Sequence, residues 1–492
     1  MGNKAFSNRN VLIICADEMR GDCAGFMGNP DIKTPNLDRL AGQSVVFEQF
    51  MTVFPKCMPA RASMMTGRYC HTGAWRTVAY QHLPAEQTTL LERFREQGYE
   101  TAVLGKNHCW DTQVYERDVD YRSYSGELGQ LMEGVPRIRV HEPNPNGAIP
   151  LELEDGWDYI GCNTRFADDE VKAEQAIRYL RDYRDRSKPF FLQVNIEAPH
   201  PVYGVEEPYY SMYDREGIAA WPHTLPKGAT LPMIAQRKYR TGESDNERAV
   251  REIQSVYYGM ITKVDTLVGS ILAELEEQGL DRNTLVLFWS DHGDYAGQYG
   301  LVEKWDTCFQ DCLMHVPFLM RGPGLPEGKR IGGLGDTTDI APTLCELLGF
   351  EPLPGMHGES LLPAIHGGGM KRAVFADGGH EDALLLRAEA EMGSQMSFGA
   401  DQPARRDAKS ITYASCPDAM ARAKMVRTDK YKLIIRLRGG NELYDMEADP
   451  QEMNNRWGDP ALAEVLPELM QLMIEWCLRT DPEEPHLARF TV

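Results

Sequence analysis

The strongest constraint on the fold of this chain is a set of apolar runs of strand length that each stop at charged or polar side chains. The runs are mostly continuous, which is typical of parallel strands buried on both faces. They lie at residues 10–16, 101–105, 188–195 and 284–290. Open α/β sheets bind their ligands beyond the carboxyl ends of the strands, at one edge of the sheet. The polar residues that follow these runs are therefore candidate site residues.

Amphipathic helical patterns separate the apolar runs between residues 10 and 349, and the clearest of them covers residues 251–279. Strand–helix alternation over this length predicts an α/β fold, with a large, mostly parallel central sheet flanked by helices. Past residue 370 the pattern changes to a strand pair and a final amphipathic helix. We therefore predict a main α/β domain at residues 1–370 and a smaller C-terminal α+β subdomain, with a small sheet and a terminal helix, at residues 371–492.

Composition argues against several kinds of partner. The 492 residues carry a formal net charge of -21, which disfavours nucleic acid and anionic membrane surfaces. No apolar run is long enough to span a membrane, and the first residues lack the apolar core of a signal peptide. The eleven cysteines show no regular spacing. We therefore expect reduced thiols and a cytoplasmic location.

The segment at residues 55–69, PKCMPARASMMTGRY, has the pattern of a short helix that begins near Cys57. Pro59 is tolerated in a first helical turn, and Gly67 stands where a helix favours a C-terminal glycine. Free backbone N–H groups at the helix start, with Arg61 one turn on, would favour negative charge at residue 57. The alternative for an isolated cysteine is a small buried apolar group without chemistry.

Acidic side chains follow the first and last runs. Asp17 and Glu18 come after the first, and Asp291 and His292 come after the last. Carboxylates that meet from separate strand ends suit a hard divalent cation such as calcium or magnesium. Manganese is a further alternative, because His292 adds a nitrogen ligand.

Basic and imidazole side chains would surround the same place. A divalent metal and cations around a nucleophile are what sulfuryl or phosphoryl transfer needs to stabilise developing charge. We therefore expect a small anionic substrate. The candidate groups are Arg61, Lys106, His108, His200 and Lys304.

The chain resembles the sulfatase family, within the alkaline-phosphatase-like superfamily. The resemblance rests on CMPARASMMTGR at 57–68, GYETAVLGKNH at 98–108, PFFLQVNIEAPH at 189–200 and SDHGDYAGQYG at 290–300. It extends to LYDMEADPQEMNN at 443–455, so the motifs span nearly the whole chain in the family's order. The resemblance implies an alkaline-phosphatase-like fold, with residues 1–370 as the catalytic domain.

The resemblance also implies the chemistry. Cys57 would be oxidised to formylglycine by a formylglycine-generating enzyme, and a hydroxyl of the hydrated aldehyde would attack the sulfur of a sulfate ester. Asp17, Glu18, Asp291 and His292 would bind one divalent metal together with the modified Cys57. The metal implied is calcium, with manganese or magnesium as alternatives.

The remaining roles follow from the same resemblance. Arg61 and His108 would orient and activate the hydrated aldehyde. Lys106 and Lys304 would bind the sulfate oxygens, and His200 would protonate the leaving oxygen. The position of Lys304 follows only from its spacing to His292.

Two departures from the family pattern bear on the reaction. Many members have Asp-Asp where this chain has Asp17-Glu18, and the second metal pair here is Asp291-His292 rather than Asp-Asn. Asp-His also occurs in related phosphonate monoester and phosphodiester hydrolases, which can use manganese. These hydrolases are therefore the alternative to a sulfatase, and a binding protein that never acquires formylglycine is a third hypothesis.

The substrate is not encoded in a readable motif. An aryl or a carbohydrate sulfate ester would fit the expected chemistry. Specificity is expected in three loops, at residues 110–165, 201–240 and 380–410. His380, Arg405 and Arg406 are candidates for substrate contact, although residues of this kind are more often solvated.

Overall fold

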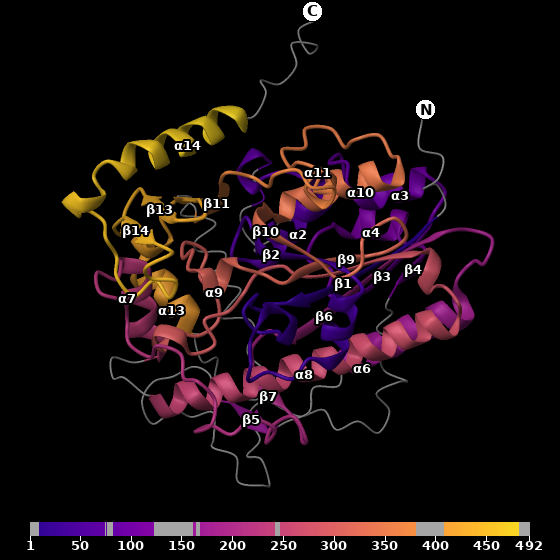
Figure 1. Ribbon diagram of the computed structural model, residues 1–492, viewed down its shortest axis with the longest axis horizontal. Coiled ribbons are helices and arrows are strands. Elements are labelled where there is room, and N and C mark those ends of the chain that lie inside the picture. Colours follow the sequence, from indigo (N-terminus) through magenta and orange to yellow (C-terminus); the bar gives the residue numbers. More distant parts are fainter. Residues whose placement is uncertain are drawn as a thin grey trace, which may run out of the picture.

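A computed structural model describes residues 9–73, 75, 82–122, 161–163, 168–241, 247–379 and 408–481. At its centre is an eight-stranded sheet with the order β10-β2-β9-β8-β1-β6-β3-β4 (Figure 1). Its strands are β1 (Asn10–Asp17), β2 (Val45–Met51), β3 (Glu100–Gly105), β4 (Tyr121–Arg122), β6 (Phe190–Pro199), β8 (Thr284–Ser290), β9 (Phe318–Arg321) and β10 (Lys329–Asp336). Strand β9 is antiparallel to both of its neighbours, and the other pairs in this sheet are parallel. The prediction of a mostly parallel central sheet is confirmed.

The register of the sheet brings the predicted strand ends to one edge. Ala16 on β1 lies opposite Ile196 on β6 and Ser290 on β8. On the far side of β6, Gly105 at the end of β3 pairs with Asn195. The residues that follow these positions therefore leave the sheet side by side.

Successive side chains of β1 point to opposite faces, and each face has its own core. Leu12, Ile14 and Ala16 pack in one core, and Val11, Ile13 and Cys15 pack in the other. Helices α1 (Pro35–Gly42), α6 (Asp168–Arg178) and α8 (Glu247–Glu277) cover the first face. The second face is covered by α2 (Cys57–Thr66), α3 (Leu90–Glu96), α4 (Thr112–Asp118), α10 (Ile340–Leu348) and α11 (Leu362–Ile365) (Figure 1).

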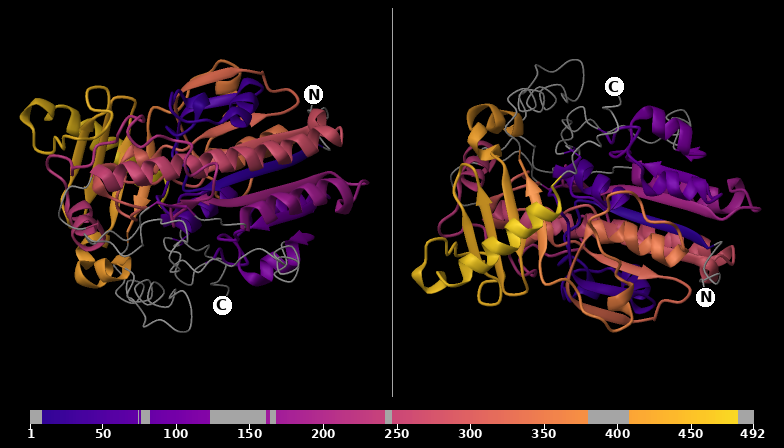
Figure 2. Two further views of the ribbon diagram at one scale, coloured as in Figure 1. Left: turned by 90° about the horizontal axis from the view of Figure 1, so that it is seen from below. Right: turned by 90° about the horizontal axis from the view of Figure 1, so that it is seen from above.

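The C-terminal part forms a separate antiparallel sheet with the order β11-β12-β13-β14. Its strands are β11 (Val374–Gly378), β12 (Ala423–Arg427), β13 (Tyr431–Arg436) and β14 (Glu442–Asp445). Helix α14 (Val465–Arg479) lies across one face of this sheet (Figure 2). Its Trp476 stacks on Phe375 with ring centroids 5.0 Å apart. The small sheet and terminal helix match the predicted subdomain, and the boundary between residues 370 and 371 stays a prediction.

Several short elements were not anticipated. The edge strand β10 was not predicted, and the strand pair expected past residue 370 corresponds to the three strands β12, β13 and β14. The expected loop at 110–165 contains α4, and the expected loop at 201–240 contains α7 (Leu231–Gln236). Other short elements are β5 (Cys162–Asn163), β7 (Gly204–Val205), α9 (Asp311–Met314) and α13 (Ala408–Ser415). Among the described helices, none has the length and apolarity that a bilayer crossing requires.

Candidate active site

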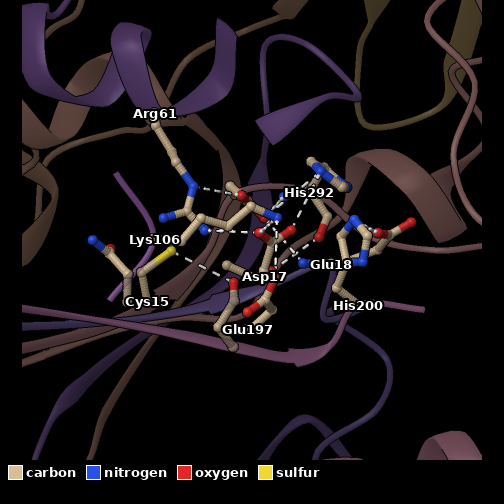
Figure 3. A network of polar contacts seen from close by, with 12 residues as sticks. Cys15, Asp17, Glu18, Arg61, Lys106, Glu197, His200 and His292 are labelled. Carbon is tan, nitrogen blue, oxygen red and sulfur yellow. Dashed lines mark hydrogen bonds and ion pairs between the residues drawn. The ribbon is translucent and has the colours of Figure 1, made fainter. Parts of the chain in front are cut away.

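The four predicted strand ends meet at one edge of the central sheet (Figure 3). Asp17 is the last residue of β1, Lys106 follows β3, His200 follows β6 and Asp291 follows β8. With Glu18, Cys57, Arg61, His108, His292 and Lys304 they form what we call the strand-end cluster. All of the predicted catalytic and metal-binding residues are therefore placed in one region.

Helix α2 begins at Cys57, as the sequence pattern predicts. The preceding residue, Lys56, takes the N-cap position in an extended conformation without a side-chain capping hydrogen bond, and Gly67 ends the helix in the left-handed conformation. The helix is buried throughout, so its free N-terminal N–H groups face the cluster rather than water. Lys56 Nζ lies 2.7 Å from Asp306 Oδ2, a buried ion pair that ties the start of α2 to the loop carrying Lys304.

Four residues offer ligand atoms that all lie within 4.8 Å of one another: Asp17, Cys57, Asp291 and His292. Nδ1 of His292 lies 2.9 Å from the carbonyl oxygen of Gly293, which can only accept a hydrogen bond. Nδ1 therefore carries a proton, which leaves Nε2 as the nitrogen that can bind a metal. Nε2 and Asp17 Oδ1 are both buried without a hydrogen-bond partner. Buried nitrogen and oxygen atoms that lack a hydrogen-bond partner are suitable ligand atoms for a divalent metal.

Arg61 joins the two carboxylates of this group. Its Nε donates to Asp291 Oδ2 over 2.8 Å, and its Nη2 donates to Asp17 Oδ2 over 3.2 Å. The planar guanidinium suits this bridging geometry. Burial alone would raise the pKa of Asp17, but Lys106 and Arg61 outweigh it and hold that pKa well below its usual range. Asp17 is therefore held ionised, as a metal ligand needs to be.

Residue 57 lies in a positive field. Burial and Asp17 would raise the pKa of the Cys57 thiol, but Lys106 and Lys304 outweigh them and lower that pKa well below its usual value. His108 also interacts with the thiol and lowers its pKa further. An oxyanion at this position would be stabilised by the same charges.

Glu18 faces a different part of the cluster. Its backbone is left-handed (φ 72°), a conformation that is strained for a residue with a side chain. Two hydrogen bonds hold it there, from its N–H to Asp291 Oδ1 and from the Tyr257 hydroxyl to its carbonyl. Oε2 of Glu18 lies 2.6 Å from Lys304 Nζ and 3.5 Å from His200 Nε2, and Oε1 is buried without a partner.

His200 is arranged as an acceptor toward Lys304. Its Nδ1 lies 2.6 Å from the carbonyl oxygen of Pro201 and therefore carries the proton. Lys304 Nζ then donates to Nε2 over 2.9 Å. Burial and the charges of Lys304 and Lys106 lower the pKa of His200 to about 3. His200 is therefore neutral near pH 7, with Nε2 accepting a hydrogen bond from Lys304.

Glu18 was predicted as a metal ligand, and its position leaves that role a prediction. It groups with Asp17 and His200 rather than with Cys57, Asp291 and His292. The candidate substrate contacts His380, Arg405 and Arg406 lie outside the described residues, as do most of the loops at 110–165 and 380–410.

Sequence reasoning missed the residues that support the cluster. Ser290 accepts a hydrogen bond from the Met19 N–H over 2.8 Å and donates to the His292 carbonyl over 2.9 Å. Tyr257 lies inside the most regular apolar helix, where nothing in the pattern separates it from core residues. Ser290 had a weak signal, since it is the polar residue that ends the apolar run at 284–290.

Comparison with protein families assigns most of the chain. A model of the sulfatase family matches residues 9–350. A model described as N-sulphoglucosamine sulphohydrolase, C-terminal, matches residues 399–478. The two matches together cover the central sheet and most of the small antiparallel sheet.

Individual proteins resemble the chain along most of its length. The multifunctional alkaline phosphatase superfamily protein PehA of Trinickia caryophylli is 27% identical, with 96% of each chain covered. An ulvan-active sulfatase of Formosa agariphila is 28% identical over 94% of this chain and 79% of its own. The solved phosphonate monoester hydrolase of Agrobacterium radiobacter superposes with a TM-score of 0.73 at 25% identity, over 96% of both chains. The sulfatase family model matches more than half of the residues of this chain, and the match includes the whole strand-end cluster. This chain belongs to the sulfatase family.

Proposed function

We propose that this protein hydrolyses sulfate esters, with residue 57 in its formylglycine form as the nucleophile. The observation that carries the proposal is the group of Asp17, Cys57, Asp291 and His292, assembled at the start of α2. Membership of the sulfatase family supports the same reaction. A sulfatase of Formosa agariphila and an arylsulfatase of Clostridium perfringens are among its relatives.

A divalent metal held by Asp17, Asp291, His292 and residue 57 would supply Lewis-acid stabilisation of negative charge at the nucleophile. Arg61 donates hydrogen bonds to the carboxylates of Asp17 and Asp291 and would keep both oriented toward the metal. We propose calcium as the ion, because most of the ligands would be hard oxygens once residue 57 is modified. The imidazole nitrogen of His292 makes manganese the competing ion, and magnesium a further one.

The basic side chains would bind and orient the ester. Lys106 and Lys304 act electrostatically on residue 57 and could contact the oxygens of the transferred group. His108 interacts with residue 57 and would help to orient it. His200 and Lys304 are hydrogen-bonded to each other, so this pair would deliver a proton to the leaving oxygen.

Conversion of Cys57 requires a formylglycine-generating enzyme as a partner. Cys57 is only 3% exposed and begins a fully buried helix, so the enzyme would have to act before α2 is packed. The test is intact-mass measurement of the peptide around residue 57 from protein produced with and without that enzyme. Exclusively unmodified cysteine in active protein would contradict the proposal.

Hydrolysis of phosphonate monoesters or phosphodiesters is the second candidate function. The similarity to the solved phosphonate monoester hydrolase, which covers 96% of this chain, favours it. The deciding experiment compares kcat/KM for 4-nitrophenyl sulfate and for 4-nitrophenyl phenylphosphonate, with the metal-loaded, modified protein. Preference for the phosphonate would replace the first proposal by the second.

We propose a cytoplasmic location because the described cysteines are present as free thiols. The ten cysteines whose side chains the structure describes are all free thiols. Reduced thiols in this number fit a reducing compartment. Fractionation of the native host, with detection by antibody, would test the location.

A further inference from the structure

Glu197 is a partly exposed carboxylate beside the strand-end cluster, and none of the roles above uses it. It lies near the end of β6, and 47% of its side chain is exposed. Its Oε1 lies 3.9 Å from Lys106 Nζ, and Lys106 Nζ lies 2.8 Å from Asp17 Oδ2 (Figure 3). A single lysine therefore separates this exposed negative charge from a candidate metal ligand.

The position of Glu197 is fixed by helix α6. Both carboxylate oxygens of Asp169 accept backbone N–H groups, from Glu197 and Ala198, each over 2.8 Å. Lys172 Nζ lies 3.0 Å from Asp169 Oδ1 and 3.2 Å from Glu197 Oε2. Asp169 and Lys172 are both buried. The Glu197 carboxylate is thus held in place by built contacts rather than left to solvent.

The charges around Glu197 do not cancel. The carboxylates of Asp169 and Glu197 share the single cation Lys172, so these three residues carry one net negative charge next to Lys106. Lys106 is one of the two cations expected to bind the oxygens of the transferred group. Glu197 repels each negative charge on that group, so a group that carries two charges meets more repulsion than a group that carries one.

We propose that Glu197 selects substrates by charge, so that esters whose transferred group carries one negative charge are preferred over esters whose group carries two. This inference rests on the proposed function and names its substrate class. Sulfate monoesters and phosphonate monoesters carry one charge on this group. Phosphate monoesters carry about 1.5 to 2 charges at pH 7.

The test is the ratio of kcat/KM for 4-nitrophenyl sulfate to that for 4-nitrophenyl phosphate at pH 8, measured with the metal-loaded, modified protein. In Glu197→Gln we expect this ratio to fall about tenfold, which corresponds to about 1.4 kcal/mol. Glu197→Asp keeps the charge and should keep a ratio closer to that of the wild type. Glutamine can still accept the hydrogen bond from Lys172, so the local structure is expected to persist.

Glu174→Gln is the matched control. Glu174 also lies on the surface near this region, on α6, but its carboxylate pairs with Arg178 at 2.8 Å and has no contact with Lys106 among the described residues. This variant should leave the ratio unchanged. Inhibition constants for methyl phosphate and methyl sulfate, which at pH 8 carry about two charges and one charge respectively, give a second readout: methyl phosphate should bind more tightly to Glu197→Gln relative to methyl sulfate.

Two failures can be told apart. If the wild type hydrolyses neither the sulfate nor a phosphonate monoester, the proposed function is wrong. If the wild type hydrolyses the sulfate, and Glu197→Gln changes neither the kinetic ratio nor the relative inhibition, the charge-selection proposal alone is overturned. An equal change in Glu174→Gln would also overturn it, because the effect would then be general electrostatics of the surface.

Discussion

The strand-end cluster and a second buried cluster, between the two sheets, are both rich in charge but differ in how completely their polar atoms are paired. The second, which we call the subdomain cluster, contains Asp311, Arg427, Lys432 and Glu452. Lys432 Nζ lies 2.5 Å from Asp311 Oδ1 and 2.8 Å from Glu452 Oε1. Arg427 Nη2 lies 3.1 Å from Asp311 Oδ2, and the Asp311 N–H donates to Glu452 Oε2 over 2.6 Å.

No side-chain nitrogen or oxygen of the subdomain cluster is buried without a partner, within the described part of the chain. In the strand-end cluster, Asp17, Glu18, Arg61, His108 and His292 each have such an atom. A charged cluster whose polar atoms are all paired holds structural elements together, whereas a cluster with unpaired buried polar atoms can still bind a ligand. The comparison therefore separates scaffold from site more clearly than burial or charge does, since both clusters are buried and charged.

Removal of the nucleophile should have the largest effect. Cys57→Ala is expected to lower kcat/KM for a sulfate ester about 10⁶-fold, the scale seen when the nucleophile of a hydrolase is removed. The fold and metal binding should persist, because the other three residues of the metal group are untouched. Kinetics together with thermal unfolding would check this. Activity close to that of the wild type would mean that the nucleophile is misassigned.

Metal binding should stabilise the protein through the strand-end cluster alone. After chelation, adding a divalent ion at about 100 times its Kd should raise the free energy of unfolding by about 2.7 kcal/mol. Asp291→Asn should lose most of this gain, because it weakens one ligand and removes one of the two carboxylate partners of Arg61. Chemical unfolding with and without metal gives the measurement for each variant.

Glu452→Gln is the control for the metal experiment. It changes a carboxylate of the subdomain cluster that is as deeply buried as Asp291. Its metal-dependent gain should equal that of the wild type. A loss of the gain in Glu452→Gln as large as in Asp291→Asn would remove the distinction between the two clusters.

A break in the subdomain cluster should cost stability. Lys432→Met leaves the buried carboxylate of Glu452 and the partly buried carboxylate of Asp311 without their shared cation, and loss of one partner of a buried ion pair typically costs about 3 to 5 kcal/mol. The double variant Lys432→Met with Glu452→Gln should recover part of that loss, because one of the uncompensated charges is gone. Urea unfolding of the single and double variants would check both. If the single variant loses less than about 1 kcal/mol of unfolding free energy, the subdomain cluster does not stabilise the fold in the way proposed.

The two clusters also differ in how far the sequence could predict them. Apolar runs that stop at 17, 106, 200 and 291 placed the strand-end cluster, because the carboxyl ends of parallel strands meet at one edge. The start of α2 at Cys57 followed from local signals, the proline and Gly67. The roles of the individual residues, including Glu18 as a ligand, remain predictions.

The subdomain cluster could not be predicted in this way. Lys432 and Asp311 are 121 positions apart, and Lys432 lies within a strand that is otherwise mostly apolar. Its pairing depends on how the small sheet docks on the large one, which no local period records. The contact between Lys172 and Glu197 could not be predicted either, since the sequence of α6 shows only the pattern of an amphipathic helix. Non-local contacts between side chains are thus where pattern-based prediction stopped.

The smallest effect is expected for an ion pair on the surface. Arg39 Nη1 lies 3.0 Å from Glu276 Oε1, a separation similar to those within both clusters, but the side chains are 45% and 39% exposed. Water and salt screen such a pair, so Glu276→Gln should change the free energy of unfolding by less than about 0.5 kcal/mol. Urea unfolding at low and at high salt would test this. A loss that approaches that of Lys432→Met would mean that charge pairing stabilises this protein regardless of solvent, and that burial is not what distinguishes the subdomain cluster from the surface.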